Sequence, residues 1–170
     1  RVQQQRADHH RLPVHHQRRL VAHRLRIVLD RRGRHRLEIS ALEDAPDHVR
    51  LGVATERVRS DDPFLCHKTT RRAIYDRARS ANPAADDVLL VNERDEVVET
   101  TVANLLYRLG AAWFTPPLTS GGLPGVGRDV QLQAGAVVER VLPLHELAEC
   151  DELAVVSSLR GRRSAAILQG

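Results

Sequence analysis

Short apolar runs separated by turn residues are the feature that most restricts the fold of this chain. Residues 88–91 are apolar, as are the first two of residues 97–99, and a polar turn at residues 92–95 separates the two segments, a pattern that predicts a β-hairpin. Two further strands, over residues 104–108 and 112–115, are predicted to join at Gly110, and others are predicted over residues 139–142 and 153–157. Because only a few helical segments accompany these strands, the pattern favours an α+β domain.

Three helices are predicted among the strands. The first covers residues 70–80, and Asn82-Pro83 ends it because the residue before a proline is pushed away from helical geometry. A Gly- and Pro-rich loop at residues 120–127 leads into a second helix over residues 128–138. A short third helix is predicted over residues 144–149.

The N-terminal part of the chain changes character at about residue 25. Residues 25–29 and 37–40 flank a turn at residues 30–33 in which Gly33 supplies a positive φ, so we predict a second hairpin, followed by a strand over residues 49–54. Residues 1–24 are rich in Arg, His and Gln and show no apolar period. We expect them to form an unstructured or divergent basic segment.

The positive charge is concentrated at the N-terminal end. Residues 1–36 carry eleven arginines against Asp8 and Asp30, within a chain whose net charge is +4. A nucleic-acid site commonly interleaves aromatic residues for base stacking, and this stretch has none, so we expect no nucleic-acid partner. Its histidines lack supporting Cys or carboxylate spacing, and we therefore predict no metal site.

The size of the chain fits a single core, since it has 170 residues and 42% hydrophobic content. No apolar run approaches the roughly 20 residues that cross a bilayer, and the first residues lack the apolar core of a signal peptide. We therefore expect a cytoplasmic protein with no membrane partner. Cys66 and Cys150 have no framework spacing and are predicted to be reduced thiols.

Lys68 is the single lysine among 26 basic residues. A chain that uses arginine for nearly every ordinary positive charge keeps lysine at a position where a guanidinium cannot replace it. A primary amine can lose its proton when desolvated and attack a carbonyl carbon, whereas a guanidinium stays charged. Lys68 is therefore a candidate nucleophile.

Five motifs follow one another in order, and they include the run His67-Lys68-Thr69-Thr70-Arg71-Arg72 around the lysine. The others lie at residues 98–105, 113–118, 122–126 and 157–161. Together they resemble the class IV (fold type IV) pyridoxal-phosphate enzymes and, within that class, the aminodeoxychorismate lyases, particularly the lyase domains fused to aminodeoxychorismate synthase component I. The resemblance runs from about Leu25 to the C-terminus.

The resemblance implies a division of the chain. Residues 63–170 would be the C-terminal, pyridoxal-phosphate-binding large domain of the D-amino-acid aminotransferase-like fold. Residues 25–62 would be a remnant of the small N-terminal domain and the segment between the domains. In the family the small domain also carries a His-x-x-Arg-Leu element whose arginine clamps the cofactor phosphate. We assign that element to no position in residues 1–24, and expect an N-terminally incomplete or divergent copy.

The resemblance also assigns roles to individual residues. Lys68 would hold pyridoxal 5′-phosphate (PLP) as a Schiff base and move protons at the substrate carbon, and Glu99 would keep the pyridine nitrogen protonated. The cofactor phosphate would bind the backbone amides of Val126 and Gly127, although the family commonly has a residue with a side chain at the position of Gly127. The predicted remaining contacts are Ser157 and Ser158 to the cofactor, and Leu159 and Arg160 to the substrate.

Other residues near the lysine have roles that the sequence leaves open. Arg71 and Arg72 lie about one helical turn past Lys68, so at least one is expected to face the pocket, but the pattern does not choose between them. Thr101 and Asn104 are expected to pack around the site, and Trp113 is expected in the core.

The implied activity is that of a PLP-dependent 4-amino-4-deoxychorismate lyase, which releases pyruvate and leaves 4-aminobenzoate for folate synthesis. One alternative is a class IV branched-chain or D-amino-acid aminotransferase, which shares the lysine, glutamate and phosphate loop. Another is a non-catalytic fragment that keeps the fold. By resemblance we expect a homodimer and an aminodeoxychorismate synthase component as partner.

Overall fold

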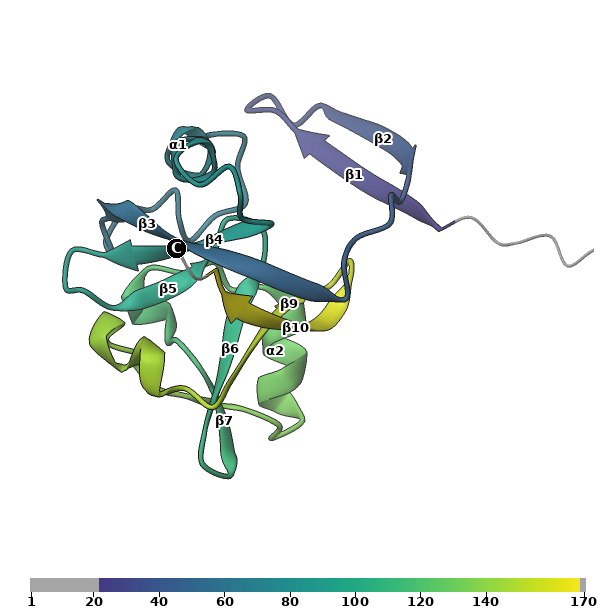
Figure 1. The fold of residues 1–170 in the computed structure, drawn as a ribbon. Helices are drawn as coiled ribbons and strands as arrows, with labels where there is room; N and C mark the ends of the chain where they lie inside the picture. The colour runs from purple at the N-terminus through teal and green to yellow at the C-terminus, as the bar shows by residue number, and fades with distance from the viewer. Residues whose placement is uncertain (1–21, 169–170) are drawn as a thin grey trace, which may run out of the picture. The chain divides into compact units, whose positions relative to one another are not determined.

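A computed structural model describes residues 22–168 of the chain. The chain divides into two compact units, residues 1–44 and residues 45–170, and residues 1–21 lie outside the described part, as does most of the predicted basic segment (Figure 1). In the first unit β1 (His23–Leu29) pairs antiparallel with β2 (His35–Ala41). Gly33 has φ +76° in the connecting turn, so the predicted hairpin is confirmed.

The second unit is built on an eight-stranded sheet with the order β5-β4-β3-β10-β9-β6-β7-β8. β3 runs parallel to both β4 and β10, and β7 runs parallel to β8, while the other neighbours are antiparallel. The strands are β3 (His48–Val58), β4 (Asp87–Asn92), β5 (Val97–Thr100), β6 (Asn104–Leu109), β7 (Ala112–Thr115), β8 (Val138–Glu139), β9 (Glu152–Ser157) and β10 (Gly161–Ile167). This mixture of strands with few helices confirms the predicted α+β class.

The sheet curls around its main core. The N–H of Val97 on edge strand β5 donates to the carbonyl of Leu142, and Glu96 forms a bridge with Pro143, so the segment after β8 closes against β5. The 3₁₀ helix η2 (Leu144–Glu149) follows and adds Leu147 to the interior. The interior cluster joins alternate residues of the strands with this segment. Its largest fully buried members are Leu51, Leu89, Val97, Leu105, Tyr107, Leu142 and Val155.

The outer face of the sheet carries the two α-helices. Helix α1 (Ala73–Ser80) packs against Val88 and Leu90, whereas Leu89 between them points into the interior cluster. On β9 the alternation repeats, because Val156 packs in the cluster beside helix α2 (Val126–Gln133) while Val155 faces the interior. The side-chain period of two therefore places α1 and α2 on one face of the sheet, opposite the interior core.

Several predicted boundaries are wrong for identifiable reasons. Helix α1 begins at Ala73 instead of residue 70, and the chain between Lys68 and Arg72 is not helical. Helix α2 begins at Val126, because Gly125 already serves as its N-cap, and it ends before Gly135, whose φ is +65°. The strand predicted over residues 139–142 shrinks to Val138–Glu139. The sequence analysis missed β10 altogether.

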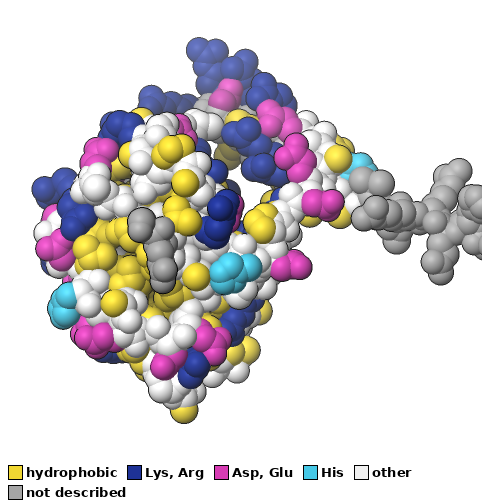
Figure 2. All heavy atoms as spheres, viewed as in Figure 1, with side chains coloured by type: hydrophobic (Ala, Val, Ile, Leu, Met, Phe, Trp, Pro, Cys, Tyr) yellow, Lys and Arg dark blue, Asp and Glu magenta, His cyan; other side chains and the backbone are white. Residues whose placement is uncertain are grey.

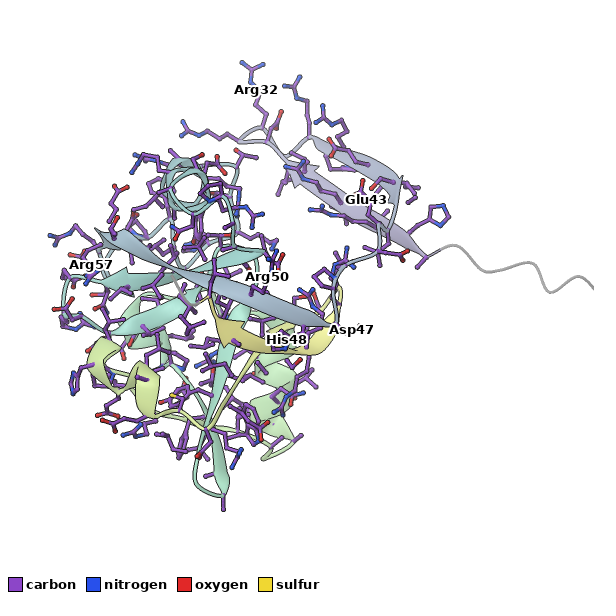
Figure 3. The ribbon with its side chains drawn as sticks, viewed as in Figure 1. Arg32, Glu43, Asp47, His48, Arg50 and Arg57 are labelled. Atoms are coloured by element: carbon purple, nitrogen blue, oxygen red, sulfur yellow. The ribbon has the colours of Figure 1, made fainter. Side chains whose placement is uncertain are left out.

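The surface of the second unit intermixes charges of both signs, as Figure 2 shows on the viewed face. Arg50 and Arg57 lie along β3 (Figure 3), where Arg50 pairs with Asp86 and Arg57 pairs with Asp95. Trp113 is only half-buried, and the guanidinium of Arg162 lies 3.8 Å from its ring centroid. In the described part of the chain no helix is long and apolar enough to cross a membrane.

Candidate active site

One cavity of about 400 Å³ brings together residues from four separate parts of the second unit. Lys68 comes from the loop before α1, Glu99 from the end of β5, and Val126 and Gly127 from the start of α2. Ser157 and Ser158 enter it from the end of β9. Six of the predicted site residues, up to 90 positions apart in the chain, thus line the same cavity.

Lys68 lies on an exposed part of the cavity wall. Its ammonium group forms no hydrogen bond or ion pair with any residue in the described range 22–168. Burial raises the pKa of Glu99, and the charge of Lys68 opposes that rise only in part. The desolvation that the sequence analysis invoked for this amine is therefore not supplied by burial in this chain. The amine is instead accessible to a molecule in the cavity.

Glu99 is buried, with 5% of its surface exposed, and its two carboxylate oxygens differ in their partners. Oε2 accepts hydrogen bonds from Nδ2 of Asn104 at 3.0 Å and from the N–H of Leu123 at 3.1 Å. Oε1 accepts only a long hydrogen bond, from the hydroxyl of Tyr75 at 3.4 Å. The carboxylate is thus fixed through Oε2, and Oε1 keeps acceptor capacity for another donor.

Burial raises the pKa of Glu99 to about 8, because the surrounding protein disfavours the charged form. The hydrogen bonds from Leu123 and Tyr75 and the positive charges of Lys68 and Arg72 oppose this shift but do not cancel it. A cationic donor beside Oε1 would favour the ionised form further. The site is therefore suited to a positively charged N–H group.

The start of helix α2 presents backbone N–H groups at the cavity. Gly125 is the N-cap and offers no side-chain cap, and the first i to i−4 bond of the helix runs from Asp129 to Gly125. The N–H groups of Val126, Gly127 and Arg128 precede that bond and have no acceptor within the helix. Their position at the positive end of the helix dipole suits an anion.

Gly127 stands where the family commonly has a residue with a side chain, and the packing explains the glycine. A Cβ added there would lie 2.8 Å from the carbonyl carbon of Ser157 and 3.1 Å from the backbone nitrogen of Ser158. The start of α2 is therefore pressed against the turn after β9. This close approach is possible only without a side chain, and it joins the two predicted phosphate-contacting segments.

The turn after β9 separates the predicted residues into two groups. Ser157 and Ser158 line the cavity, and Oγ of Ser157 accepts the N–H of Arg160 at 3.3 Å. Leu159, with 44% of its surface exposed, and Arg160 do not line the cavity. Their predicted contact with substrate stays a prediction.

Two residues that the sequence analysis did not single out support the site. Tyr75, on helix α1, is buried and reaches Glu99. Asp87, also buried, accepts hydrogen bonds from both the hydroxyl and the N–H of Thr101, at 2.5 and 3.2 Å, and so holds the turn after Glu99. Tyr75 lies seven residues after Lys68. The sequence feature that could have identified it is its place among the apolar residues of the helix predicted over residues 70–80.

The open choice between the two arginines is also resolved. Both line the cavity, but Nη2 of Arg72 donates to the carbonyl of Thr101 at 2.6 Å, and its guanidinium lies 4.6 Å from the ring centroid of Tyr75. Arg72 therefore supports the cavity wall. Arg71 instead contacts the ring of Phe64 at 4.3 Å.

The family model described as amino-transferase class IV matches residues 5–167. A protein of Schizosaccharomyces pombe, provisionally named an aminodeoxychorismate lyase, is 35% identical over 105 residues, which are 59% of this chain and 45% of that protein. The chain spans about half the length of the curated relatives that it matches.

Solved structures share the fold. A provisionally assigned amino-acid aminotransferase from Mesorhizobium loti superposes with a TM-score of 0.82 at 35% identity, covering 86% of this chain and 73% of that one. A protein from Legionella pneumophila, provisionally named a 4-amino-4-deoxychorismate lyase, gives a TM-score of 0.72 at 26% identity, covering 79% of this chain and 53% of that one.

The family match begins at residue 5 and so includes a segment that the sequence analysis left unassigned. His16-Gln17-Arg18-Arg19-Leu20 has the His-x-x-Arg-Leu spacing and was overlooked. The neighbouring histidines and arginines of this basic stretch obscured it. These five residues lie outside the part that the structure describes.

Proposed function

Because this chain belongs to the class IV aminotransferase family, we propose that it is a PLP-dependent 4-amino-4-deoxychorismate lyase, forming 4-aminobenzoate and pyruvate. The observation that carries the proposal is the convergence of Lys68, Glu99 and the start of α2 on one cavity. The lyase-like run of residues 67–72 and the relative from Schizosaccharomyces pombe support the lyase over other reactions of the family.

The donor set of the cavity fits PLP. The exposed primary amine matches the aldehyde of PLP, and the buried carboxylate matches its pyridinium nitrogen. The amides at the start of α2 match its phosphate. When bound, PLP supplies a carbonyl that reacts with amines and a ring that accepts an electron pair from the neighbouring carbon. Lys68, Glu99, and the amides of Val126 and Gly127 with Ser157 and Ser158 would hold these three parts.

Lys68 has the proton-transfer role. Its amine would remove the proton at the amine-bearing ring carbon and later give a proton to the departing pyruvate. Its exposure toward the cavity and its lack of a hydrogen-bond partner among the described residues leave it able to move between these positions. No described residue has to give up a hydrogen bond to Lys68 before its amine can act.

Glu99 has the role of keeping a proton at the pyridine nitrogen. With Oε2 fixed by Asn104 and Leu123, Oε1 is the oxygen that would accept the N–H of the ring. The buried surroundings strengthen this interaction, because charges attract more strongly where water is excluded. The hydroxyl of Tyr75, which reaches the same Oε1, would limit rotation of the carboxylate.

A cytoplasmic homodimer with access to an aminodeoxychorismate synthase component completes the proposal.

A class IV aminotransferase is the second candidate, and the match to the Mesorhizobium loti protein favours it. The two candidates differ in their products. Purified chain is mixed with PLP and 4-amino-4-deoxychorismate, and pyruvate and 4-aminobenzoate are measured; in parallel, PLP with a branched-chain or D-amino acid and an acceptor keto acid is assayed for amino transfer. The lyase predicts equal amounts of pyruvate and 4-aminobenzoate. Amino transfer without pyruvate release would contradict the lyase and support the aminotransferase. No turnover in either assay would support a non-catalytic fragment.

A further inference from the structure

Arg71 lies where two cavities meet. A smaller cavity of about 200 Å³ lies beside the main one, and Phe64, Leu65, Arg71 and Tyr75 line both. Arg71 is therefore on the wall that the two cavities share. Lys68, three residues earlier, lines only the main cavity.

The guanidinium of Arg71 has no hydrogen-bond acceptor among residues 22–168. Its side chain contacts the face of Phe64, and only its backbone N–H is bonded, to Oγ1 of Thr69 at 3.1 Å. Arg72 is committed to the carbonyl of Thr101, and Arg77 of the smaller cavity forms two hydrogen bonds with Glu56. Arg71 is thus the arginine of the main cavity that still has its donors available.

The surroundings of Arg71 suit a carboxylate on the main-cavity side. A guanidinium held over an aromatic ring by its face keeps its N–H groups at the edge, where they match the two oxygens of a carboxylate. Asp62 lines the smaller cavity. Burial and Glu99 raise the pKa of Tyr75, and the negative charge of Asp62 adds to that rise. That charge disfavours an anion in the smaller cavity.

We propose that Arg71 binds the ring carboxylate of the substrate. It would make the site selective for a cyclic amino acid over the analogue in which a neutral amide replaces that carboxylate. This inference rests on the proposed function for the identity of the ligand. Three residues of chain span at most ~10 Å, so Arg71 and Lys68 can reach opposite ends of one six-membered ring. Lys68 would act at the amine-bearing carbon while Arg71 holds the carboxylate across the ring.

The test compares an acid with its neutral counterpart. The full chain, with PLP present, is titrated by calorimetry with 4-aminobenzoate and with 4-aminobenzamide. We expect the wild-type chain to bind the acid at least tenfold more tightly. Arg71→Gln should weaken binding of the acid about tenfold to a hundredfold, the range for hydrogen bonds to a charged group, and leave binding of the amide unchanged. Arg71→Lys should retain part of the preference because it keeps the charge.

Arg162→Gln is the matched control, because Arg162 also lies over an aromatic ring but lines neither cavity. It should bind both compounds like the wild-type chain. The proposal is overturned if the wild-type chain shows no preference for the acid, if Arg71→Gln retains it, or if Arg162→Gln loses it equally. An Arg71-dependent preference without pyruvate release from 4-amino-4-deoxychorismate would sink the lyase and keep the carboxylate site. Pyruvate release with an unchanged Arg71→Gln variant would do the reverse.

Discussion

Asn104 and Glu99 are joined by a hydrogen bond of 3.0 Å between two buried side chains. The same amide nitrogen of Asn104 also donates to the carbonyl of Leu123 at 2.9 Å. A Cβ on Gly125 would lie 2.0 Å from Oδ1 of Asn104, so the N-cap of α2 packs directly on this amide. One side chain therefore links the carboxylate end of the cavity to the loop that carries the anion-binding amides.

Replacing Asn104 with Ala should destabilise the chain and loosen the cavity. The change removes two hydrogen bonds and leaves the carbonyl of Leu123 and part of Glu99 without a donor, which typically costs about 1–3 kcal/mol of unfolding free energy for a buried group. Urea denaturation followed by circular dichroism measures the loss. Stability and PLP affinity both equal to those of the wild-type chain would show that the linking role is wrong.

The pH dependence of stability should reveal the buried carboxylate. The pKa of Glu99 is about 8 in the folded chain and has an ordinary value of 4.5. Between these values the folded chain keeps a proton that the unfolded chain has released, so the free energy of unfolding falls as pH rises, by about 1.4 kcal/mol per pH unit. Below pH 4.5 the carboxyl group is protonated in both states, and the stability that Glu99 loses at higher pH is fully present.

Glu99→Gln isolates that effect because the amide cannot titrate. Without PLP, the stability difference between variant and wild-type chain should grow in favour of the variant from pH 5 to pH 8. Urea denaturation at each pH provides the measurement. A difference that stays constant with pH would mean that Glu99 is ionised throughout.

Gly127→Ala should disturb the anion-binding end. The added methyl group meets backbone atoms of Ser157 and Ser158, which cannot rotate away, so α2 must shift, at a cost of about 1–3 kcal/mol. PLP affinity, measured by absorption titration, should fall with it. Gly122→Ala is the control, because a Cβ there meets Val98 at 3.6 Å and Oε2 of Glu99 at 3.7 Å, both ordinary van der Waals distances. Equal behaviour of the two variants would contradict the predicted role of the Gly127 contact.

Turn chemistry made much of the fold predictable. The hairpin of β4 and β5 and the hairpin of β6 and β7 were placed by polar turns and by Gly110, which has φ +60°. β10 was not predicted, because its sequence begins Gly161-Arg162-Arg163 and Ala165 is its single buried residue. Its position between β3 and β9 follows from long-range pairing, which a local pattern does not contain.

The candidate site was predictable where family motifs carried it and unpredictable where packing did. Lys68 and Glu99 were identified from their motifs, and the structure brings them to one cavity. The different partners of Arg71 and Arg72 depend on Phe64, Thr101 and Tyr75, whose positions are set by the tertiary fold. The need for Gly127 likewise appears only when β9 is in place.

The covalent capture of PLP by Lys68 tests the central claim most directly. The full chain is incubated with PLP, reduced with borohydride and digested, and the modified peptide is located by mass spectrometry. The wild-type chain should carry the cofactor on Lys68, its single lysine. Lys68→Arg should keep the fold, because the side chain is exposed, and carry none on that peptide. An unmodified Lys68 in the wild-type chain, or the same level of cofactor on this peptide in Lys68→Arg, would contradict the account.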